Sequence, residues 1–390
     1  MLRAAGTLLS IALPLAGAAG IHWDFEGGSL ERVERAAPDH FRVFVKGQTD
    51  QDHRNRQASW YYFRVDGAAP GALLTIDVLG LPGEYNYQPN RGAITQDTPP
   101  FISYDGIRWQ HIRETEYDSQ IPRLQLQIHP QQPRFWVAHT PPYTLTHLEQ
   151  LRKAVLRHPD AGEQAIGKSV EGRDLLLWTI GKADAKATAW LMFRQHAWES
   201  GSSWAGDGAV RALLADPSLL AGVRWKIFPM ADPDGVAQGG VRFNRNGYDL
   251  NRNWDVSDAR VMPEIFAQRK AIADWRTAGN SIDLFFTLHN TETAEYLEGP
   301  AGPLAERLFE TLKRQTTFDP TRPLSVVAAN RERGRANVVQ ALGPSDGIPA
   351  FLMEQRIAQN NRLEHRPGID DRTAFGRQLV RAIYSTLRSP

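Results

Sequence analysis

The chain has 390 residues, of which 42% are hydrophobic and 23% are charged, and its net charge at pH 7 is +1. This composition is typical of a globular protein with room for two domains, and the balanced charge excludes a global field favouring nucleic acid or an anionic membrane. The chain contains no cysteine, which excludes disulfides, thiolate catalysis and cysteine-bound metals. Any metal site must therefore use His, Asp and Glu.

Residues 1–20 have the pattern of a secretory signal peptide. Arg3 supplies a positive start, residues 8–15 an apolar core, and the Ala-Gly-Ala at 16–18 an A-x-A cleavage site. The segment is short and glycine-rich for a membrane span, and no other window reaches that length. We therefore expect an exported protein, periplasmic or secreted, with no membrane span in its mature chain. An uncleaved anchor is the alternative.

Residues 21–140 are expected to form an all-β antiparallel sandwich. Runs such as "WYYFRVDG", "ALLTIDVLG", "LQLQIHP" and "RFWVAHT" read as short strands, and turn signals such as "DGAAPG" and "QPNRG" separate them. No helical period lies between these runs. Strands at this spacing are typical of a β-sandwich.

Residues 141–390 have a different pattern, which begins after the proline-rich stretch "HTPPYT". The segment "LTHLEQLRKAVLRH" carries apolar residues at helical spacing. Apolar strands then alternate with helical segments, with strands near 175–181, 188–195, 223–230, 282–290 and 351 and helices near 203–215, 262–277, 302–314 and 371–387. This alternation predicts an α/β sheet covered by helices on both faces.

Four polar residues lie at the expected ends of these strands: His196, Glu199, His289 and Glu354. Functional groups collect beyond the carboxyl ends of the strands in such a sheet. A catalytic zinc ion needs three protein ligands and an open position, and His196, Glu199 and His289 supply a His₂Glu set. Glu354 would then be free to take a proton from water. The alternative is a strand-end histidine paired with a nearby carboxylate.

A second H-x-x-E pair, His111 and Glu114, occurs in the expected sandwich. No companion histidine follows a strand there, and a chain with 11 histidines is expected to contain such a pair by chance. Strand-end geometry therefore favours the pair formed by His196 and Glu199.

The glycine-rich loop 231–254 follows an expected strand and carries Arg242, Arg245, Asn251 and Arg252. A guanidinium group is the preferred partner of a carboxylate, and asparagine adds a further donor. Another arginine can stabilise the oxyanion of a tetrahedral intermediate. The alternative is a solvated basic loop.

The motifs "RQHAWES", "DPDGV…R…YDLNRNW", "TLHN" and "FLMEQR", in this order, resemble those of the zinc metallocarboxypeptidase family. The front stretch "ASWYYFRVDGA…LTIDVLG…PPFISYDGIRWQ…FWVAHTPPYTLTHLEQL" resembles the β-sandwich of cytosolic-carboxypeptidase-like members and their bacterial relatives. The resemblance implies a mixed-sheet α/β catalytic domain at 141–390 preceded by the sandwich at 21–140.

The resemblance also implies roles for individual residues and one Zn²⁺ per chain. It implies that His196, Glu199 and His289 are the zinc ligands and that Asp249 orients the first histidine. The remaining matched residues are Asn251 and Arg252 for the substrate carboxylate, Arg242 for the scissile carbonyl and its oxyanion, and Glu354 as general base and acid.

Two features depart from the family pattern. Family members often have a mobile tyrosine over the substrate, and Tyr296 lies too near His289 to match it. The residue that selects the terminal side chain cannot be aligned either. Arg331, Arg333 and Arg335 lie in the right neighbourhood, and one of them could meet an acidic side chain; a solvated charge run is the alternative.

The sequence therefore predicts a zinc-dependent metallocarboxypeptidase that hydrolyses the C-terminal residue of peptides or proteins, with acidic residues as a candidate preference. No nucleic-acid partner is expected. Two alternatives stay open: a zinc deacylase or amidase on the same scaffold, and a binding protein that has kept the fold without turnover.

Overall fold

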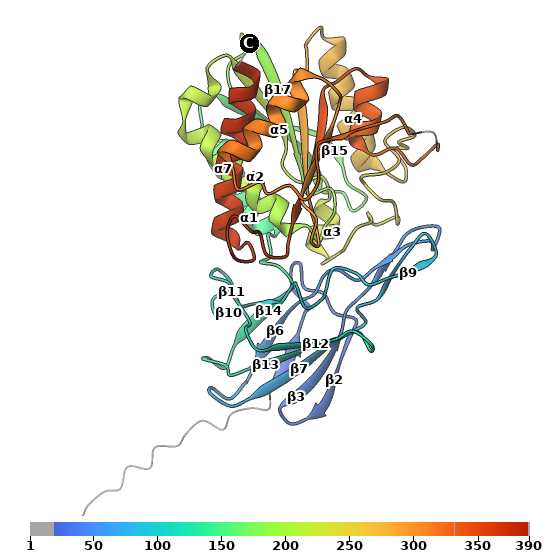
Figure 1. Cartoon of the computed structure of the whole chain (residues 1–390), viewed down its shortest axis with the longest axis vertical. Coiled ribbons are helices and arrows are strands. Elements are labelled where there is room, and N and C mark those ends of the chain that lie inside the picture. The colour runs from blue at the N-terminus through green and yellow to red at the C-terminus, as the bar shows by residue number, and fades with distance from the viewer. Residues whose placement is uncertain (1–18, 331, 389–390) are drawn as a thin grey trace, which may run out of the picture.

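The computed structural model describes residues 19–330 and 332–388, which form an N-terminal β domain and a helix-covered sheet domain, one above the other in Figure 1. The expected signal peptide lies outside these residues except for Ala19 and Gly20, and Gly20 begins the first strand. None of the helices in the described part of the chain has the length and hydropathy needed to span a bilayer.

The N-terminal domain contains two five-stranded sheets and one smaller sheet. The first sheet has the order β1-β6-β14-β10-β11, with β1 (Gly20–His22), β6 (Tyr62–Asp66), β14 (Phe135–Ala138), β10 (Phe101–Ser103) and β11 (Gln110–His111). The second has the order β12-β13-β7-β3-β2, with β12 (Thr115–Asp118), β13 (Arg123–Ile128), β7 (Leu74–Leu79), β3 (His40–Phe44) and β2 (Arg32–Ala37). The small sheet joins β4 (Gln48–Thr49), β5 (Arg56–Gln57), β8 (Gly83–Tyr85) and β9 (Gln88–Asn90).

The two larger sheets share one apolar core, as the alternating strand patterns predict. In β13, Leu124, Leu126 and Ile128 are buried while the intervening residues are more exposed, and they belong to the same core cluster as Phe63 and Val137 of the other sheet. The predicted sandwich is confirmed. One detail differs from a fully antiparallel arrangement, because β3 and β7 pair in parallel.

The second domain is built on an eight-stranded mixed sheet with the order β15-β16-β18-β17-β19-β22-β20-β21. Its strands are β15 (Ala161–Lys168), β16 (Asp174–Ile180), β18 (Val223–Phe228), β17 (Ala187–Phe193), β19 (Leu284–Thr291), β22 (Ala350–Arg356), β20 (Tyr296–Gly299) and β21 (Ser325–Val326). The four central strands, from β18 to β22, are parallel to one another. Antiparallel pairs flank them on both sides.

Helices cover both faces of this sheet, as the sequence predicts. They are α1 (Leu145–Val155), α2 (Ser200–Ala215), α3 (Pro233–Ala237), α4 (Pro263–Thr277), α5 (Pro303–Gln315), α6 (Val338–Gln340) and α7 (Ile369–Arg388), with short helical turns at Pro217–Leu220 and Ala341–Ser345. In β17, Leu191 and Phe193 contact the core shared with α2, α5 and α7, whereas Trp190 and Met192 contact the core shared with α4. Figure 1 shows these two groups of helices on opposite sides of the sheet.

Helices α2 and α7 approach one another closely through small residues. A Cβ atom at Gly208 would overlap the backbone of Thr373, and one at Gly376 would overlap the backbone of Ala205. This close contact fixes α2 directly against α7. The position of α2 matters because the residue immediately before it is Glu199.

Candidate active site

The turn between β17 and α2 places His196 and Glu199 on one side of a tight bend. Arg194 begins this turn in the left-handed region, with φ of 59°. Its buried guanidinium donates to the Ala197 carbonyl at 2.7 and 2.9 Å and to Ser203 Oγ at 3.0 Å, which holds the turn closed. Glu199 is the N-cap residue of α2.

The structure brings His196, Glu199 and His289 together. One ligand atom from each lies within 4.8 Å of the other two. His196 Nδ1 is 2.6 Å from Glu199 Oε1, and His289 Nδ1 is 3.0 Å from Glu199 Oε2. β17 and β19 are parallel neighbours, with Phe193 opposite Leu288, and this pairing brings the two histidines close. All three side chains are almost fully buried.

The donor atoms fit a zinc ion. Two imidazoles and one carboxylate are a donor set that zinc uses in catalytic sites. Glu199 Oε2 and His289 Nδ1 are both buried, and neither makes a hydrogen bond, despite their short separation. Buried polar atoms without partners are rare, and a cation placed among them would satisfy both.

The charges around Glu199 and His196 favour the charged state of each. Burial alone would raise the pKa of Glu199, but the two imidazoles hold it well below its usual range. Burial and Arg242 oppose protonation of His196, but Glu199 and Asp249 outweigh them and raise its pKa. The ionised carboxylates of Glu199 and Asp249 therefore attract positive charge to this position, either as a proton or as a metal ion.

Asp249 links His196 to Arg242, and both Asp249 and Arg242 belong to the loop 231–254. Its Oδ1 atom lies 3.0 Å from His196 Nε2, and its Oδ2 atom accepts a hydrogen bond from Arg242 Nε at 2.7 Å. Burial would raise the pKa of Asp249, but Arg242 and His196 keep it well below its usual range. An ionised Asp249 accepts the Nε2 proton of His196, and Nδ1, which faces Glu199, would then be the ligand atom for a metal ion.

Gln195 plays the corresponding part for His289, and the sequence analysis did not identify it. Gln195 Oε1 lies 2.9 Å from His289 Nε2, and Gln195 Nε2 donates to the Leu250 carbonyl at 2.7 Å. The amide is therefore oriented by its partner and keeps the proton of His289 on Nε2. No local pattern in the sequence distinguishes this glutamine, because its role depends on the distant residues Leu250 and His289.

Glu354 lies beside His289 in the sheet. The two residues are opposite one another on β22 and β19, and Tyr296 of β20 is opposite Glu354 on its other side. Because residues opposite one another in a sheet share a face, all three side chains project to the same side. Glu354 Oε2 is buried without a hydrogen bond, and burial together with Glu199 raises the pKa of Glu354 well above its usual range.

The loop after β18 holds the other predicted residues. Its turn signals predicted an irregular loop, but part of it forms the short helix α3. The backbone N–H of Asn251 donates to Asp249 Oδ1 at 2.8 Å, and the Asn251 side chain accepts from Val338 N at 3.1 Å. Arg252 is partly exposed and donates to the Asn251 carbonyl at 2.7 Å. Arg242, Asp249 and Asn251 thus form one connected network with His196.

The other H-x-x-E pair has no comparable surroundings. His111 Nε2 lies 3.2 Å from the Arg366 carbonyl, and its ring contacts Phe101 with centroids 4.1 Å apart. Within the described residues, the one cluster of three potential ligands is the set at His196, Glu199 and His289. The preference for this pair over His111 and Glu114 agrees with the geometry.

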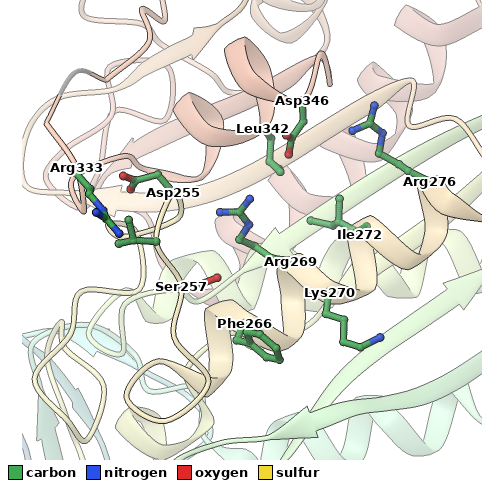
Figure 2. A pocket seen from close by; sticks show the side chains of 12 residues that line it. Asp255, Ser257, Phe266, Arg269, Lys270, Ile272, Arg276, Arg333, Leu342 and Asp346 are labelled. Atoms are coloured by element: carbon green, nitrogen blue, oxygen red, sulfur yellow. The ribbon is translucent and has the colours of Figure 1, made fainter.

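A large cavity of about 720 Å³ runs along α4, away from the three potential ligands. Figure 2 shows Arg269, Arg276 and Arg333 around it, together with Asp255 and Asp346. None of His196, Glu199, His289 and Glu354 lines it. The potential ligands converge elsewhere, and catalysis depends on convergent chemical groups rather than on the volume of a cavity.

Two of the three arginines considered for selecting the terminal side chain of the substrate, Arg333 and Arg335, can be compared, and they differ in their surroundings. Arg333 lines the cavity along α4, Arg335 is partly buried, and Arg331 lies outside the described residues. Tyr296 carries a stacked arginine, because the Arg322 guanidinium lies 3.5 Å from the centre of its ring.

A mixed α/β sheet with His-Glu-His donors and an adjacent carboxylate has the features of a zinc hydrolase. A sequence profile described as zinc carboxypeptidase matches residues 147–297. A second profile, the cytosolic carboxypeptidase N-terminal domain, matches residues 21–139. The chain therefore contains a zinc carboxypeptidase domain and, before it, the N-terminal domain of the cytosolic carboxypeptidases. These matches confirm the resemblance, the hydrolase class and the zinc cofactor.

Individual relatives agree with this assignment. An uncharacterised protein of Zymomonas mobilis is 25% identical over 330 residues, which are 81% of each chain. Cytosolic carboxypeptidase 2 of Homo sapiens is 26% identical over 280 residues, covering 64% of this chain but only 30% of the human protein. The chain thus spans about a third of the length of that relative.

Solved structures of bacterial proteins share the whole fold. The metallo-carboxypeptidase of Burkholderia cenocepacia superposes with a TM-score of 0.81 at 23% identity, covering 95% of this chain and 99% of that one. A metallo-carboxypeptidase of Pseudomonas aeruginosa, solved in complex with (2-guanidinoethylmercapto)succinic acid, gives 0.78 at 22% identity, with 94% and 99% covered. At these identities the likeness establishes the fold of both domains.

Proposed function

We propose that this protein hydrolyses the C-terminal residue of peptides or proteins, with one zinc ion held by His196, Glu199 and His289. The observation that supports this most strongly is the convergence of three buried ligand atoms within 4.8 Å of one another. The zinc would supply a Lewis acid that polarises the scissile carbonyl and lowers the pKa of water.

Glu354 is proposed as the group that moves the proton. It lies beside His289 on the same face of the sheet and outside the set of three ligands. Burial and the nearby Glu199 carboxylate raise its pKa, which suits a group that accepts a proton and then donates it. Glu354 would take one proton from the attacking water and pass it to the nitrogen of the leaving amino acid, which leaves as an amine while the new carboxyl group forms.

Arg242 is proposed to stabilise the negative charge that develops on the carbonyl oxygen. Its Nε atom is held by Asp249, which leaves the two terminal nitrogens of the guanidinium for other partners. Burial would lower the pKa of Arg242, but Asp249 and Glu199 raise it, so the group stays charged. A fixed cation of this kind costs no reorganisation when the oxyanion forms.

Asn251 and Arg252 are proposed to bind the free carboxylate of the substrate. The Asn251 side-chain oxygen and backbone N–H are already used inside the protein, which leaves its Nδ2 donor. Arg252 is partly exposed and uses one terminal nitrogen on the Asn251 carbonyl. The remaining N–H groups suit a carboxylate, which accepts from two donors at once.

We further propose an acidic terminal residue as the preferred substrate. The support is Arg335, a partly buried side chain in the segment whose next residue, Ala336, accepts a hydrogen bond from Trp254 N at 3.1 Å. This contact brings the segment against the loop of Asn251 and Arg252. Peptides that differ only in a terminal Glu, Leu or Lys would test the preference, and an Arg335→Ala variant should lose it while Arg333→Ala keeps it.

Export is the proposal for localisation, and it rests on the residue pattern of 1–20. Cell fractionation and determination of the mature N-terminus would test it. A mature chain that begins at residue 19 supports export, because the A-x-A pattern ends at residue 18. A cytoplasmic protein that retains Met1 contradicts it.

The activity itself is tested with short peptides that carry either a free C-terminal carboxylate or an amide, analysed by mass spectrometry with and without a chelator. We expect loss of one terminal residue from the free peptide, no cleavage of the amide, and no cleavage after zinc removal until zinc is restored. Equal cleavage of both peptides would favour a deacylase or amidase. A purified protein without zinc would contradict the proposal.

A further inference from the structure

Among the contacts between the N-terminal domain and the loop of Arg242, the side chain of Gln48 makes several hydrogen bonds at once. Gln48 Oε1 accepts hydrogen bonds from three consecutive backbone N–H groups, those of Val241 at 3.0 Å, Arg242 at 2.7 Å and Phe243 at 2.9 Å. Gln48 Nε2 donates to the Phe243 carbonyl at 2.6 Å. Both the oxygen and the nitrogen of the Gln48 amide therefore form hydrogen bonds with the backbone of the catalytic domain.

The pattern of partners fixes the orientation of this amide. Three N–H groups can only face its oxygen, and a carbonyl can only face its nitrogen. Successive backbone N–H groups that point to one place form a concave, positively polarised site. In this protein the oxygen of Gln48 fills that site, and it thereby determines the backbone path from Val241 to Phe243.

The backbone held by Gln48 carries the side chain of Arg242. That side chain donates to Asp249 Oδ2 at 2.7 Å, and Asp249 Oδ1 lies 3.0 Å from His196 Nε2. Phe243 and Asp249 also form an isolated antiparallel bridge, so the two ends of this loop are held together. Gln48 therefore contacts the backbone of Arg242, whose side chain is the group proposed to stabilise the oxyanion.

Gln48 lies in a strand whose pairing and following turn are closed by hydrogen bonds. It belongs to β4, which pairs with β5, and Figure 1 places the small sheet that contains them and β9 on the side of the N-terminal domain that faces the catalytic domain. The turn after β4 is closed by the buried side chain of Asp50, which accepts from Arg54 N at 2.8 Å and from Asn55 Nδ2 at 2.6 Å. The amide is therefore presented by an ordered strand and turn.

We infer that Gln48 is a positioning residue for Arg242, so that the N-terminal domain completes the active site of the catalytic domain. This inference rests on the proposed function, because it takes Arg242 as the group that stabilises the oxyanion. Gln48 does not touch the substrate; it acts by holding the backbone from which Arg242 extends. A displacement of about 1 Å at such a group can cost on the order of 100-fold in rate.

The test uses the full-length zinc-loaded protein and the variants Gln48→Leu and Gln48→Asn. Leucine removes every hydrogen bond of the amide, and asparagine keeps the amide but shortens it by one methylene group. Gln51→Ala is the matched control, because Gln51 contacts the same loop only through its backbone N–H, which donates to the Gly247 carbonyl at 3.1 Å. For each variant, kcat, KM, zinc content and amide hydrogen exchange at residues 241–243 are measured.

We expect kcat of both Gln48 variants to fall about 10- to 100-fold, while KM and zinc content stay close to wild type. Gln51→Ala should keep wild-type kcat. In an Arg242→Ala background, Gln48→Leu should lower kcat by no more than about twofold further, because the two residues act through one group. The amides of 241–243 should exchange faster in the Gln48 variants and unchanged in the control.

Unchanged kcat in the Gln48 variants, or losses that multiply in the double variant, would overturn the inference while leaving the peptidase intact. A wild-type protein that cleaves no peptide would contradict the proposed function instead. In that case amide exchange still decides whether Gln48 holds the loop: unchanged exchange overturns the positioning role, and faster exchange supports it.

Discussion

Two segments of this chain contain the same spacing, His111 with Glu114 and His196 with Glu199, and the fold treats them differently. The first pair lies in the sandwich, where His111 faces a backbone carbonyl. The second lies between a central strand and α2, where His289 completes a set of three donors. The spacing alone therefore does not define a metal site; the neighbouring strand that supplies the third donor does.

The surroundings of the two histidines shift their pKa values in opposite directions. Burial, with Arg366 nearby, lowers the pKa of His111. The pKa of His196 is raised despite burial and Arg242, because Glu199 and Asp249 lie within contact. The pKa of His111 stays lowered although Asp371 opposes the shift, whereas two carboxylates lie within 3.0 Å of the His196 ring.

The largest expected effect comes from replacing the two histidines separately. His196→Ala should abolish zinc binding and reduce peptidase activity to the detection limit, because a two-donor site holds zinc poorly. His111→Ala should retain stoichiometric zinc and measurable activity. Metal analysis of both purified variants is the measurement, and zinc retained in His196→Ala would remove this histidine from the proposed set.

Glu354→Gln should separate metal binding from turnover. The amide has nearly the shape of the carboxylate but cannot take a proton, so kcat should fall about 10²- to 10⁴-fold. Zinc content should stay at one per chain, since Glu354 is outside the set of three ligands. Activity close to wild type in a zinc-loaded Glu354→Gln protein would remove the proposed base.

Two arginines of one loop allow a smaller and more specific test. Arg252→Ala should raise KM for peptides with a free carboxylate about 10- to 100-fold, as expected for losing a charged hydrogen bond of about 1.5–3 kcal/mol. Arg245→Ala is the control, because Arg245 pairs with Glu171 at 2.7 Å near the surface. Equal KM values for the two variants would argue against Arg252 as part of the carboxylate site.

The smallest expected effect concerns His139, a buried histidine of the sandwich. His139 stacks between Tyr61 and Trp198 of the other domain, and burial, with Arg366 nearby, lowers its pKa to about 3. Between pH 6.5 and 3 the unfolded chain therefore binds a proton that the folded chain does not, so stability falls as the pH falls through this window. At pH 4 the cost is about 3 kcal/mol.

A His139→Gln variant should lose less stability than wild type between pH 7 and pH 4, because glutamine does not titrate. Urea unfolding at both pH values is the measurement, and His129→Gln, at an exposed position, is the control. If wild type and His139→Gln lose the same free energy of unfolding between pH 7 and pH 4, His139 does not contribute to acid sensitivity.

Much of the fold was predictable because its elements repeat local patterns. Alternation in strands such as β13 and helical spacing in α1 reflect which side chains face a core, and both can be recognised in the sequence. Less regular elements were missed: β15 is mostly half-exposed, β21 has two residues, and α3 is a single turn within a loop of turn residues. Their position depends on what they pack against rather than on their own composition.

The residue types of the candidate site were predictable for the same reason, since His196 and Glu199 follow an apolar strand and His289 lies in another. Gln195 and Gln48 were not, because a single glutamine has no local signal. Gln48 bonds to backbone 194 residues further along the chain, and only folding brings the two segments together.

The sequence by itself determined that the chain has a β-sandwich, a helix-covered sheet and the donor atoms for zinc, because hydrophobic period and side-chain chemistry are local properties. The tertiary structure alone decided which of two identical spacings converges with a third donor, and which amide of the sandwich reaches the arginine loop. Strand register and the contact between domains set those distances, and both depend on residues that are far apart in the chain.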